Sequence, residues 1–521
     1  MYRRTFLGSI AGAAFFHMTR SAWSADSHAR VEILADQPIG RIAPEIYGHF
    51  AEHLGGVVYD GIWVGEGSKI ANTGGMRQAL IDKLKQIKAP VIRWPGGCFA
   101  DSYDWKDGVG PRTSRPTRSN FWGGGNWQMG TKSRQLYEDN AFGTDEFIRF
   151  CRLSGAQPYL AANLRSLPAQ DFVRWVEYCN SPAGSTSMAK ARGGEPYDVR
   201  YWGVGNESWG CGGNFSPEEY ASEYMRFTSF VPDYGKRIEL IGAGPGGDDQ
   251  DWTRRFFEAL KRKTSYSPPL TGWSLHHYVD DLGQGKGDAL EFGAAEWNET
   301  LKRGRRTEQI ITSQWELIGA YDPKRKVKLV VDEYGAWYRP GSQLDPSHIL
   351  GQQSTLRDAV LTALTLDIFN RHADKVAMAN CAQLINCLNA LFFSHEDKFV
   401  VTPVFHVFDL YKQHQDAVAL AADWQGDEVT GSASLKDGVL CLTLTNASPD
   451  QPRQVEIALR GKSMTAAQGW SLGDGDMRAH NDFTRPDAVR PKPMSVAQSG
   501  STLIATLPAA SAAKIEARMA I

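Results

Sequence analysis

The feature that most constrains the fold is a regular alternation of short apolar runs with amphipathic stretches between residues 40 and 415. The apolar runs read as buried strands, and they cover 45–48, 89–94, 158–163, 199–204, 238–242, 273–277, 327–332 and 377–384. Helical periodicity separates them, for example at 76–87, 144–153, 170–179, 251–263 and 356–371. Strands joined by helical crossovers pair in parallel, and eight of them can close into a (β/α)8 TIM barrel. A doubly wound open sheet could use the same alternation.

The pattern changes after about residue 415. Strand-like runs at 439–445 and 454–459 are separated by a turn cluster at 446–450, and no further helix of comparable strength follows. Short strands between turn signals predict an antiparallel β-sandwich over 416–521. A strand-like run within 30–39 precedes the barrel and is expected to add a strand. The sequence thus predicts an α/β fold, a barrel over 40–415 followed by a β-sandwich.

The N-terminus has the pattern of a targeting signal. Arg3 and Arg4 precede a short apolar run at 6–16, and small residues follow near position 25. A paired arginine before such a run is typical of a twin-arginine export signal, here assigned to 1–25. The apolar run is too short to span a bilayer. We therefore expect a periplasmic or secreted protein; a cytosolic protein with a basic N-terminus is the alternative.

Charge and cysteine content narrow the possible partners. The formal net charge is −2 and no run of Lys and Arg forms a basic stripe, so nucleic acid is not an expected partner. No other segment qualifies as transmembrane, so no membrane partner is expected either. The 7 cysteines show no paired metal-ligand spacing, and in an oxidising compartment their odd number leaves at least one thiol free or intermolecular.

Polar and ionisable residues follow the predicted barrel strands, where barrel enzymes build their sites. Glu207 ends the fourth strand and Glu333 the seventh. Two carboxylates across a barrel mouth can flank a glycosidic bond, one as acid/base and the other as nucleophile. Asn206 could bond a substrate hydroxyl beside the reacting carbon. Arg93, from the second strand, is expected to keep Glu333 ionised.

Six motifs resemble those of glycoside hydrolase family 51, the α-L-arabinofuranosidases, a family in the clan of retaining barrel glycosidases. They are IYGHFAEHLG (46–55), GIWVG (61–65), RWPGGCF (93–99), GNE (205–207), DEYG (332–335) and AQLIN (382–386). They fall in order along the predicted barrel, and the resemblance spans essentially the whole chain. It departs from some members at 334–335, where they carry Trp-Asn, and we interpret the stretch 121–127 as a local variation.

The resemblance also implies a binding pocket for the arabinofuranosyl ring. Its contacts would be Glu52, Cys98, Asn206, Tyr278 and Gln383, with Trp337 lining the wall. Cys98 is accordingly expected to be a reduced thiol that touches the sugar. Cys211 is the rival for that role, and a buried structural cysteine is the simpler alternative.

Two motif matches point elsewhere and are set aside. HFAEH (49–53) spells an inverted zinc-peptidase signature, but that motif needs a helix and this segment runs from a strand into a loop. GAGPGG (242–247) spells a dinucleotide fingerprint, but Pro245 interrupts it and acidic residues follow. We therefore expect no metal and no organic cofactor.

The leading hypothesis is an exo-acting, retaining α-L-arabinofuranosidase that releases terminal groups from arabinan, arabinoxylan or derived oligosaccharides. A β-xylosidase or endo-glucanase with the same carboxylates is the second hypothesis. A catalytically silent carbohydrate-binding protein is the third, and the presence of both glutamates speaks against it. The resemblance also favours a homo-oligomer, such as a hexamer.

Overall fold

The structure is a computed structural model. It describes residues 28–123, 136–262, 270–279, 287–339, 341–342, 344–345, 348–426, 428–473, 475–499 and 502–519. The expected export signal at 1–25 lies outside the described residues.

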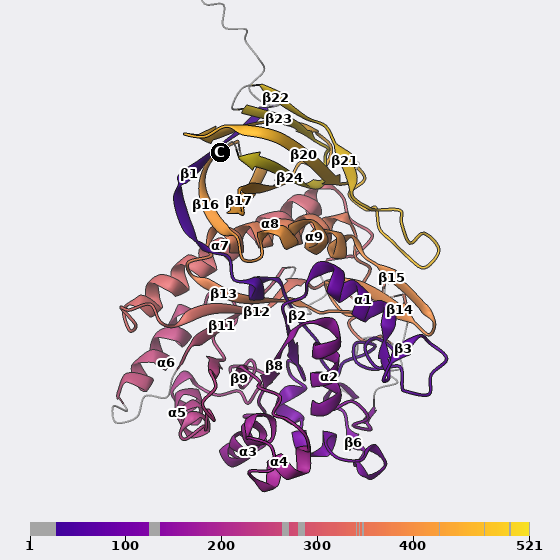
Figure 1. The fold of residues 1–521 in the computed structure, drawn as a ribbon, viewed down its shortest axis with the longest axis vertical. Coiled ribbons are helices and arrows are strands. Elements are labelled where there is room, and N and C mark those ends of the chain that lie inside the picture. The colour runs from indigo at the N-terminus through magenta and orange to yellow at the C-terminus, as the bar shows by residue number, and fades with distance from the viewer. Residues whose placement is uncertain are drawn as a thin grey trace, which may run out of the picture.

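Eight parallel strands form a closed barrel, seen in the middle and lower part of Figure 1. They are β2 (Gly48–Phe50), β5 (Val91–Trp94), β8 (Gln157–Ala161), β9 (Tyr201–Val204), β10 (Glu239–Gly242), β11 (Gly272–Val279), β12 (Lys328–Ala336) and β13 (Val376–Ala382). Each strand pairs with the next one along the chain, and β13 pairs back with β2. The predicted barrel is confirmed, and the open doubly wound sheet is excluded.

The barrel strands are short and almost wholly buried, because each is covered by a helix outside and by side chains inside. A layer of large side chains fills the barrel towards the N-terminal ends of the strands: Val91, Tyr159, Tyr201, Ile241, Val330 and Met378. The functional end of the barrel is therefore the opposite one, at which the strands end.

The helices are α1 (Gln78–Ile87), α2 (Thr144–Ser154), α3 (Ala169–Asn180), α4 (Ser187–Arg192), α5 (Pro217–Thr228), α6 (Gln250–Arg262), α7 (Ala294–Gly319), α8 (Leu356–Arg371) and α9 (Pro403–Tyr411). All five ranges predicted from helical periodicity lie on helices, within two residues at each end. The longest helix, α7, has no counterpart among them. Short 3-10 turns are found at Ala100–Ser102, Trp105–Gly108, Arg112–Ser114, Phe121–Gly123 and Lys412–His414.

The first predicted strand, at 45–48, is wrong in position. Pro44–Tyr47 forms a 3-10 turn, and the strand begins only at Gly48. Proline is favoured in the first turn of a helix because its missing N–H would have no partner there. That preference outweighs the strand-like composition of the segment.

The C-terminal part forms a ten-stranded sheet, shown above the barrel in Figure 1. Its strands are β1 (His28–Arg41), β16 (Val418–Gln425), β17 (Val429–Lys436), β18 (Val439–Asn446), β19 (Arg453–Arg460), β20 (Met464–Leu472), β21 (Lys492–Met494), β22 (Val496–Ser499), β23 (Thr502–Leu507) and β24 (Ser511–Met519). The N-terminal strand β1 lies inside this sheet, antiparallel to β16 and parallel to β19. The sheet curves around its own apolar core, which includes Val31, Leu442 and Ile515.

Short strand pairs decorate the barrel loops. They are β3 (Asn72–Thr73) with β4 (Met76–Arg77), β6 (Arg118–Ser119) with β7 (Tyr137–Glu138), and β14 (Phe392–His395) with β15 (Lys398–Val401).

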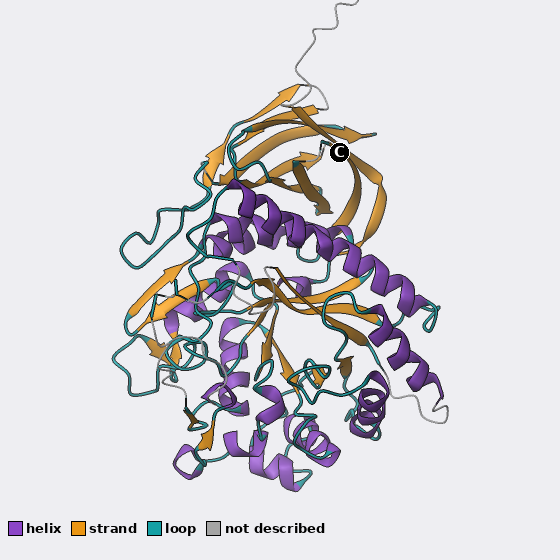
Figure 2. Cartoon of the chain, turned by 180° about the vertical axis from the view of Figure 1, so that it is seen from behind, coloured by secondary structure: helices purple, strands orange, loops and turns teal. Residues whose placement is uncertain are grey.

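Helix α8 lies between the barrel and the sheet, as Figures 1 and 2 show. It is buried on nearly every face, as its mostly apolar sequence requires. Its Asp367 accepts hydrogen bonds from Ser432, Thr443 and Thr445 of the sheet. These bonds join the two parts of the chain. Within the described ranges, no helix combines the length and apolar character that crossing a membrane requires.

Candidate active site

The predicted site residues converge at the ends of the barrel strands. Arg93 lies on β5, Tyr278 on β11 and Glu333 on β12, while Glu52, Asn206, Glu207 and Gln383 follow their strands by one to three residues. Parallel strands bring these ends to one rim, so residues separated by hundreds of positions in the sequence become neighbours.

Glu207 and Glu333 face each other across this rim. One carboxylate oxygen of each lies within 4.8 Å of the other, together with a ring nitrogen of His276. His276 Nδ1 is 2.9 Å from Glu207 Oε1 and 3.6 Å from Glu333 Oε2. The two carboxylates are therefore close enough to act on one bond and are joined through a single imidazole.

Burial and the charged neighbours of Glu333 shift its pKa in opposite directions. Burial alone would raise its pKa, but His276 and Arg93 outweigh this effect and lower the pKa below its ordinary value. Arg93 Nη1 donates to Oε1 at 2.7 Å, and the Tyr278 hydroxyl donates to Oε2 at 2.8 Å. Glu333 is thus held ionised, with both oxygens fixed in position, which suits a nucleophile.

Glu207 has a more open setting. Its side chain is 17% exposed, against 6% for Glu333. Its backbone φ of 39° lies in the left-handed region, which a residue with a side chain seldom adopts. Strain of this kind persists where the surrounding structure imposes it, and it occurs often at functional sites. The carboxylate is thereby presented to the pocket on a sharp turn after β9.

His276 is protonated more readily than an ordinary histidine. Burial lowers its pKa, but the charges of Glu333 and Glu207 outweigh this and raise it overall. The neighbouring His277 points away and lies 3.3 Å from the Arg303 carbonyl. Of the two adjacent imidazoles, His276 is therefore the one in the site.

Asn206 is fixed by two neighbours. Its side-chain oxygen accepts from Arg93 Nη2 at 2.6 Å, and its backbone N–H donates to Asp101 at 3.2 Å. Arg93 accordingly holds both Asn206 and Glu333 in place. The amide nitrogen of Asn206 remains on the side of Cys211, at 3.8 Å from its sulfur.

Glu52 is a buried carboxyl group close enough to Glu333 to feel its charge. Burial raises its pKa to about 8, with the charge of Glu333 adding to the effect and a hydrogen bond from the Phe99 N–H opposing it. Gln383 Nε2 and Trp122 Nε1 also donate to it, at 3.1 and 3.2 Å. Glu52 is thus mainly protonated at neutral pH.

Several buried polar atoms around the site lack hydrogen-bond partners among the described residues, and Trp337 Nε1 and Gln383 Oε1 are among them. Trp337 packs edge-on against Tyr278, with ring centres 5.2 Å apart. A buried donor and a buried acceptor without partners are costly unless a ligand satisfies them. A sugar carries hydroxyls that can do so.

The expectation of a reduced Cys98 thiol is wrong. Cys98 forms a disulfide with Cys211, with a Cα–Cα distance of 5.5 Å. The two residues are 113 positions apart, but each follows a barrel strand, β5 or β9, and these strand ends meet at the rim. Cys211 lies on the loop that carries Glu207, so the bond ties this loop to the end of β5. The other five cysteines are free and buried.

Trp122 and His276 also contact carboxylates of the site, although the sequence alone did not single them out. Trp122 reaches Glu52 from the 3-10 turn Phe121–Gly123. That stretch reads as a variable Gly/aromatic loop in the sequence, and its remaining residues, 124–127, lie outside the described ones. His276 sits one residue before a predicted strand end, and its position two residues before Tyr278 was a usable signal, since alternate strand residues face the same side.

The structure also explains the two rejected motifs. His49 is on strand β2 and His53 is in the loop after it, so the segment is no helix. His53 accepts a hydrogen bond from Trp94 and contacts Glu138, which makes it a structural residue. After the second motif, at 242–247, Asp248 accepts hydrogen bonds from Ser313 and Gln314 of α7. This loop is therefore packed against α7.

Comparisons with known proteins agree with this geometry. Residues 83–279 match the family described as α-L-arabinofuranosidase 1 domain, and residues 332–511 match the α-L-arabinofuranosidase C-terminal domain. An intracellular exo-α-L-arabinofuranosidase of Bacteroides ovatus is 36% identical over 95% of this chain and 96% of its own. The structure of a family 51 arabinofuranosidase from Xanthomonas axonopodis pv. citri is 37% identical, with a TM-score of 0.88 over 95% of this chain and 100% of that one. An arabinose complex from Thermotoga maritima is 27% identical, with a TM-score of 0.81 over 94% and 100%.

The expectation of export is contradicted by one of these comparisons. The Bacteroides relative, which aligns with nearly the whole chain, is named as an intracellular enzyme. Two arginines before a short apolar run form a weak pattern, because a basic N-terminus of a cytosolic protein has the same appearance. The assignment to the periplasm or the medium is therefore withdrawn.

Three observations point to the same family: the fold, the order of the motifs along the barrel and the extent of the alignments. The Bacteroides relative and the Xanthomonas structure each align with 95% of this chain, and with 96% and 100% of their own. This chain belongs to the α-L-arabinofuranosidases of glycoside hydrolase family 51.

Proposed function

We propose that Glu333 is the nucleophile and Glu207 the acid/base of this enzyme. As a family 51 member it is an exo-acting α-L-arabinofuranosidase that retains the anomeric configuration. The observation that carries the assignment is the approach of the two carboxylates to within 4.8 Å, with Arg93 and Tyr278 on Glu333 alone. Retaining enzymes place their carboxyls ~5–5.5 Å apart, whereas inverting enzymes need ~6.5–9.5 Å to admit a water.

In the first step, a Glu333 oxygen attacks the anomeric carbon while the glycosidic C–O bond breaks. Glu207 gives its proton to the departing oxygen, so the alcohol leaves neutral. The products are an arabinofuranosyl ester of Glu333 and an ionised Glu207. His276 can then hold the new carboxylate, because it lies 2.9 Å from Glu207 and its raised pKa favours the protonated ring.

In the second step, Glu207 takes a proton from water as the water oxygen attacks the same carbon. The ester bond breaks and its electron pair returns to Glu333. Two inversions give net retention and restore both carboxyl groups. No metal or cofactor enters either step.

The remaining pocket residues hold the sugar in this proposal. Glu52, Cys98, Asn206, Tyr278 and Gln383 contact the ring, and Trp337 forms a wall. The unpaired Trp337 N–H and Gln383 carbonyl support these roles. The neutral Glu52 carboxyl supports its role too, since it can donate a hydrogen bond to a hydroxyl. Cys98 takes part as half of a disulfide.

We propose that the natural substrates carry terminal arabinofuranosyl groups, as in arabinan, arabinoxylan or derived oligosaccharides. The intracellular relative makes short oligosaccharides the first ones to test. Nitrophenyl α-L-arabinofuranoside, β-xyloside and β-glucoside should be assayed side by side. Preference for the arabinofuranoside by two orders of magnitude or more supports the proposal, and preference for either β-glycoside favours the xylosidase or glucanase alternative. A homo-oligomer, such as a hexamer, remains a proposal that light scattering can test.

A further inference from the structure

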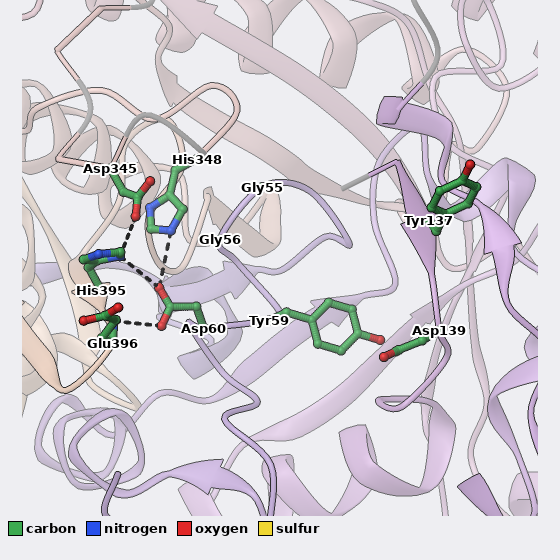
Figure 3. Close-up of a pocket in the computed structure, with 10 residues that line it drawn as sticks. All are labelled: Gly55, Gly56, Tyr59, Asp60, Tyr137, Asp139, Asp345, His348, His395 and Glu396. Carbon is green, nitrogen blue, oxygen red and sulfur yellow. Dashed lines mark hydrogen bonds and ion pairs between the residues drawn. The ribbon is translucent and has the colours of Figure 1, made fainter. Parts of the chain in front are cut away.

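A polar pocket is lined in part by the loop after β2, the loop that also carries Glu52. It is a cavity of about 520 Å³ lined by four separate segments, and three of them carry the residues considered next (Figure 3). Gly56 and Asp60 come from the loop after β2, Asp345 and His348 from the segment between β12 and α8, and His395 from the end of β14. None of these side chains belongs to the catalytic residues described above.

Two imidazoles in this pocket face the same carboxylate oxygen. His348 Nε2 lies 3.4 Å from Asp60 Oδ2, and His395 Nδ1 lies 3.8 Å from it. The three atoms all lie within 4.8 Å of one another. Asp345 contacts His395 Nδ1 as well (Figure 3).

These spacings are close to the edges of a metal coordination sphere: 3.4 Å lies within the range for a tetrahedral site, and 3.8 Å lies just above it. Zinc binds imidazole nitrogen and carboxylate oxygen at ~2.0–2.2 Å, which in a tetrahedron sets the ligand atoms ~3.3–3.6 Å apart. Two imidazole nitrogens with one or two carboxylates are a donor set that suits Zn²⁺ and related divalent metals. The sequence does not reveal the set, because its members are scattered over more than three hundred positions.

The residues around the cluster hold it in place. Asp60 Oδ1 accepts from the Glu396 N–H at 3.0 Å and from Arg77 Nη2 at 3.3 Å, which turns Oδ2 towards the two histidines. Gly56 leaves room for the His348 ring, since a Cβ at that position would lie 2.3 Å from Nε2. Outer contacts that fix the orientation of ligands are a regular part of metal sites.

We propose that Asp60, His348 and His395 form a binding site for a divalent transition metal of the Zn²⁺ type, with Asp345 able to complete the set. The metal ties together three loops at the rim of the barrel. One of them, the loop after β2, also carries Glu52 of the catalytic pocket. Because the ligands are separate from Glu207 and Glu333, the metal stabilises the fold and takes no part in bond breaking.

The test uses the full chain without a polyhistidine tag, stripped with a chelator and then titrated with ZnCl2. Calorimetry should find one tight site per chain, and Tm should rise by a few degrees because the metal binds only the folded protein. His395→Ala and His348→Gln should each weaken binding at least tenfold and abolish the rise in Tm. Since His395 is partly exposed at the end of a hairpin, its variant should fold and keep its kcat.

The matched control is His480→Ala, which removes another partly exposed histidine near a carboxylate, 3.9 Å from Asp482, in the C-terminal domain. It should bind zinc like the unchanged enzyme. Anomalous diffraction at the zinc edge should give a peak between Asp60, His348 and His395. No binding, binding that persists in the His395 and His348 variants, or a peak at Glu207, His276 and Glu333 would overturn the proposal. The cluster would then be a set of His–Asp ion pairs.

Discussion

His276 Nδ1 lies 2.9 Å from Glu207 Oε1, on the side of that carboxylate that faces Glu333. One imidazole therefore contacts both carboxylates on which the chemistry depends. Its pKa is raised by the two carboxylates, so it keeps a positive charge to higher pH than an ordinary histidine and acts on the charge of both neighbours.

Replacing His276 by alanine should shift the pH dependence of the enzyme. His276 is one of the cations that lower the pKa of Glu333, so its loss raises that pKa. The nucleophile must be ionised, and the acidic limb of kcat/KM should therefore move to higher pH, with a ~10–100-fold loss at the optimum. His277→Gln is the matched control and should leave the limb in place. If the pH dependence of kcat/KM were the same in the His276 variant, His276 would not be a cation that acts on Glu333.

Arg93→Ala should reduce both stability and activity. The guanidinium contacts Glu333 and Asn206 and lies 3.8 Å from Asp332, and all of these groups are buried. Removing one partner of a buried ion pair leaves an uncompensated charge, which costs ~3–5 kcal/mol. Urea unfolding should show this loss, and Arg93→Lys should recover part of it. If Arg93→Ala had the same free energy of unfolding as the unchanged enzyme, the buried Glu333 would not need this cation as its partner.

Glu52→Gln should change how stability depends on pH. The pKa of Glu52 is about 8 in the folded protein, above its ordinary value of 4.5, so folding favours the protonated form. Its contribution to stability is complete below pH 4.5 and is lost as the pH rises through about 8. Tm of the unchanged enzyme should therefore fall, relative to Glu52→Gln, over this window. Parallel Tm curves for the two proteins would contradict the assignment.

Reducing the disulfide Cys98–Cys211 should lower stability. The bond closes a loop between residues 113 positions apart, and disulfides of this kind stabilise by ~2–4 kcal/mol. Dithiothreitol should lower Tm and decrease turnover, because the bond lies beside Glu207. A Cys98→Ser, Cys211→Ser double variant should show the same lowered Tm with or without reductant. Equal Tm values for the oxidised and reduced enzyme would leave the bond without a structural role.

Much of the fold and of the site could be predicted from the sequence, because barrel enzymes repeat one arrangement in which site residues follow the ends of the strands. Strand ends can be read from hydrophobic patterns, and Arg93, Glu207 and Glu333 each stand at such an end. The Cys98–Cys211 pairing could not be read in this way, since it depends on how two loops 113 residues apart meet in space. The cluster of Asp60, His348 and His395 could not be predicted either, for the same reason. The 3-10 turn at Pro44–Tyr47 was misread because a local proline preference outweighs composition.

The roles of the two glutamates can be tested in one experiment with azide. Glu207→Ala should lose ~10²–10⁴-fold on poor leaving groups and less on good ones, since it supplies acid/base catalysis. With azide it should form the α-arabinofuranosyl azide, because azide replaces water in the second step and attacks the ester of Glu333. Glu333→Ala cannot form that ester, so any azide product should have the β configuration after a single displacement. NMR of the anomeric proton distinguishes the two products. The account predicts the α-azide from Glu207→Ala, and the β-azide or no product from Glu333→Ala. The β-azide from Glu207→Ala together with the α-azide from Glu333→Ala would contradict it.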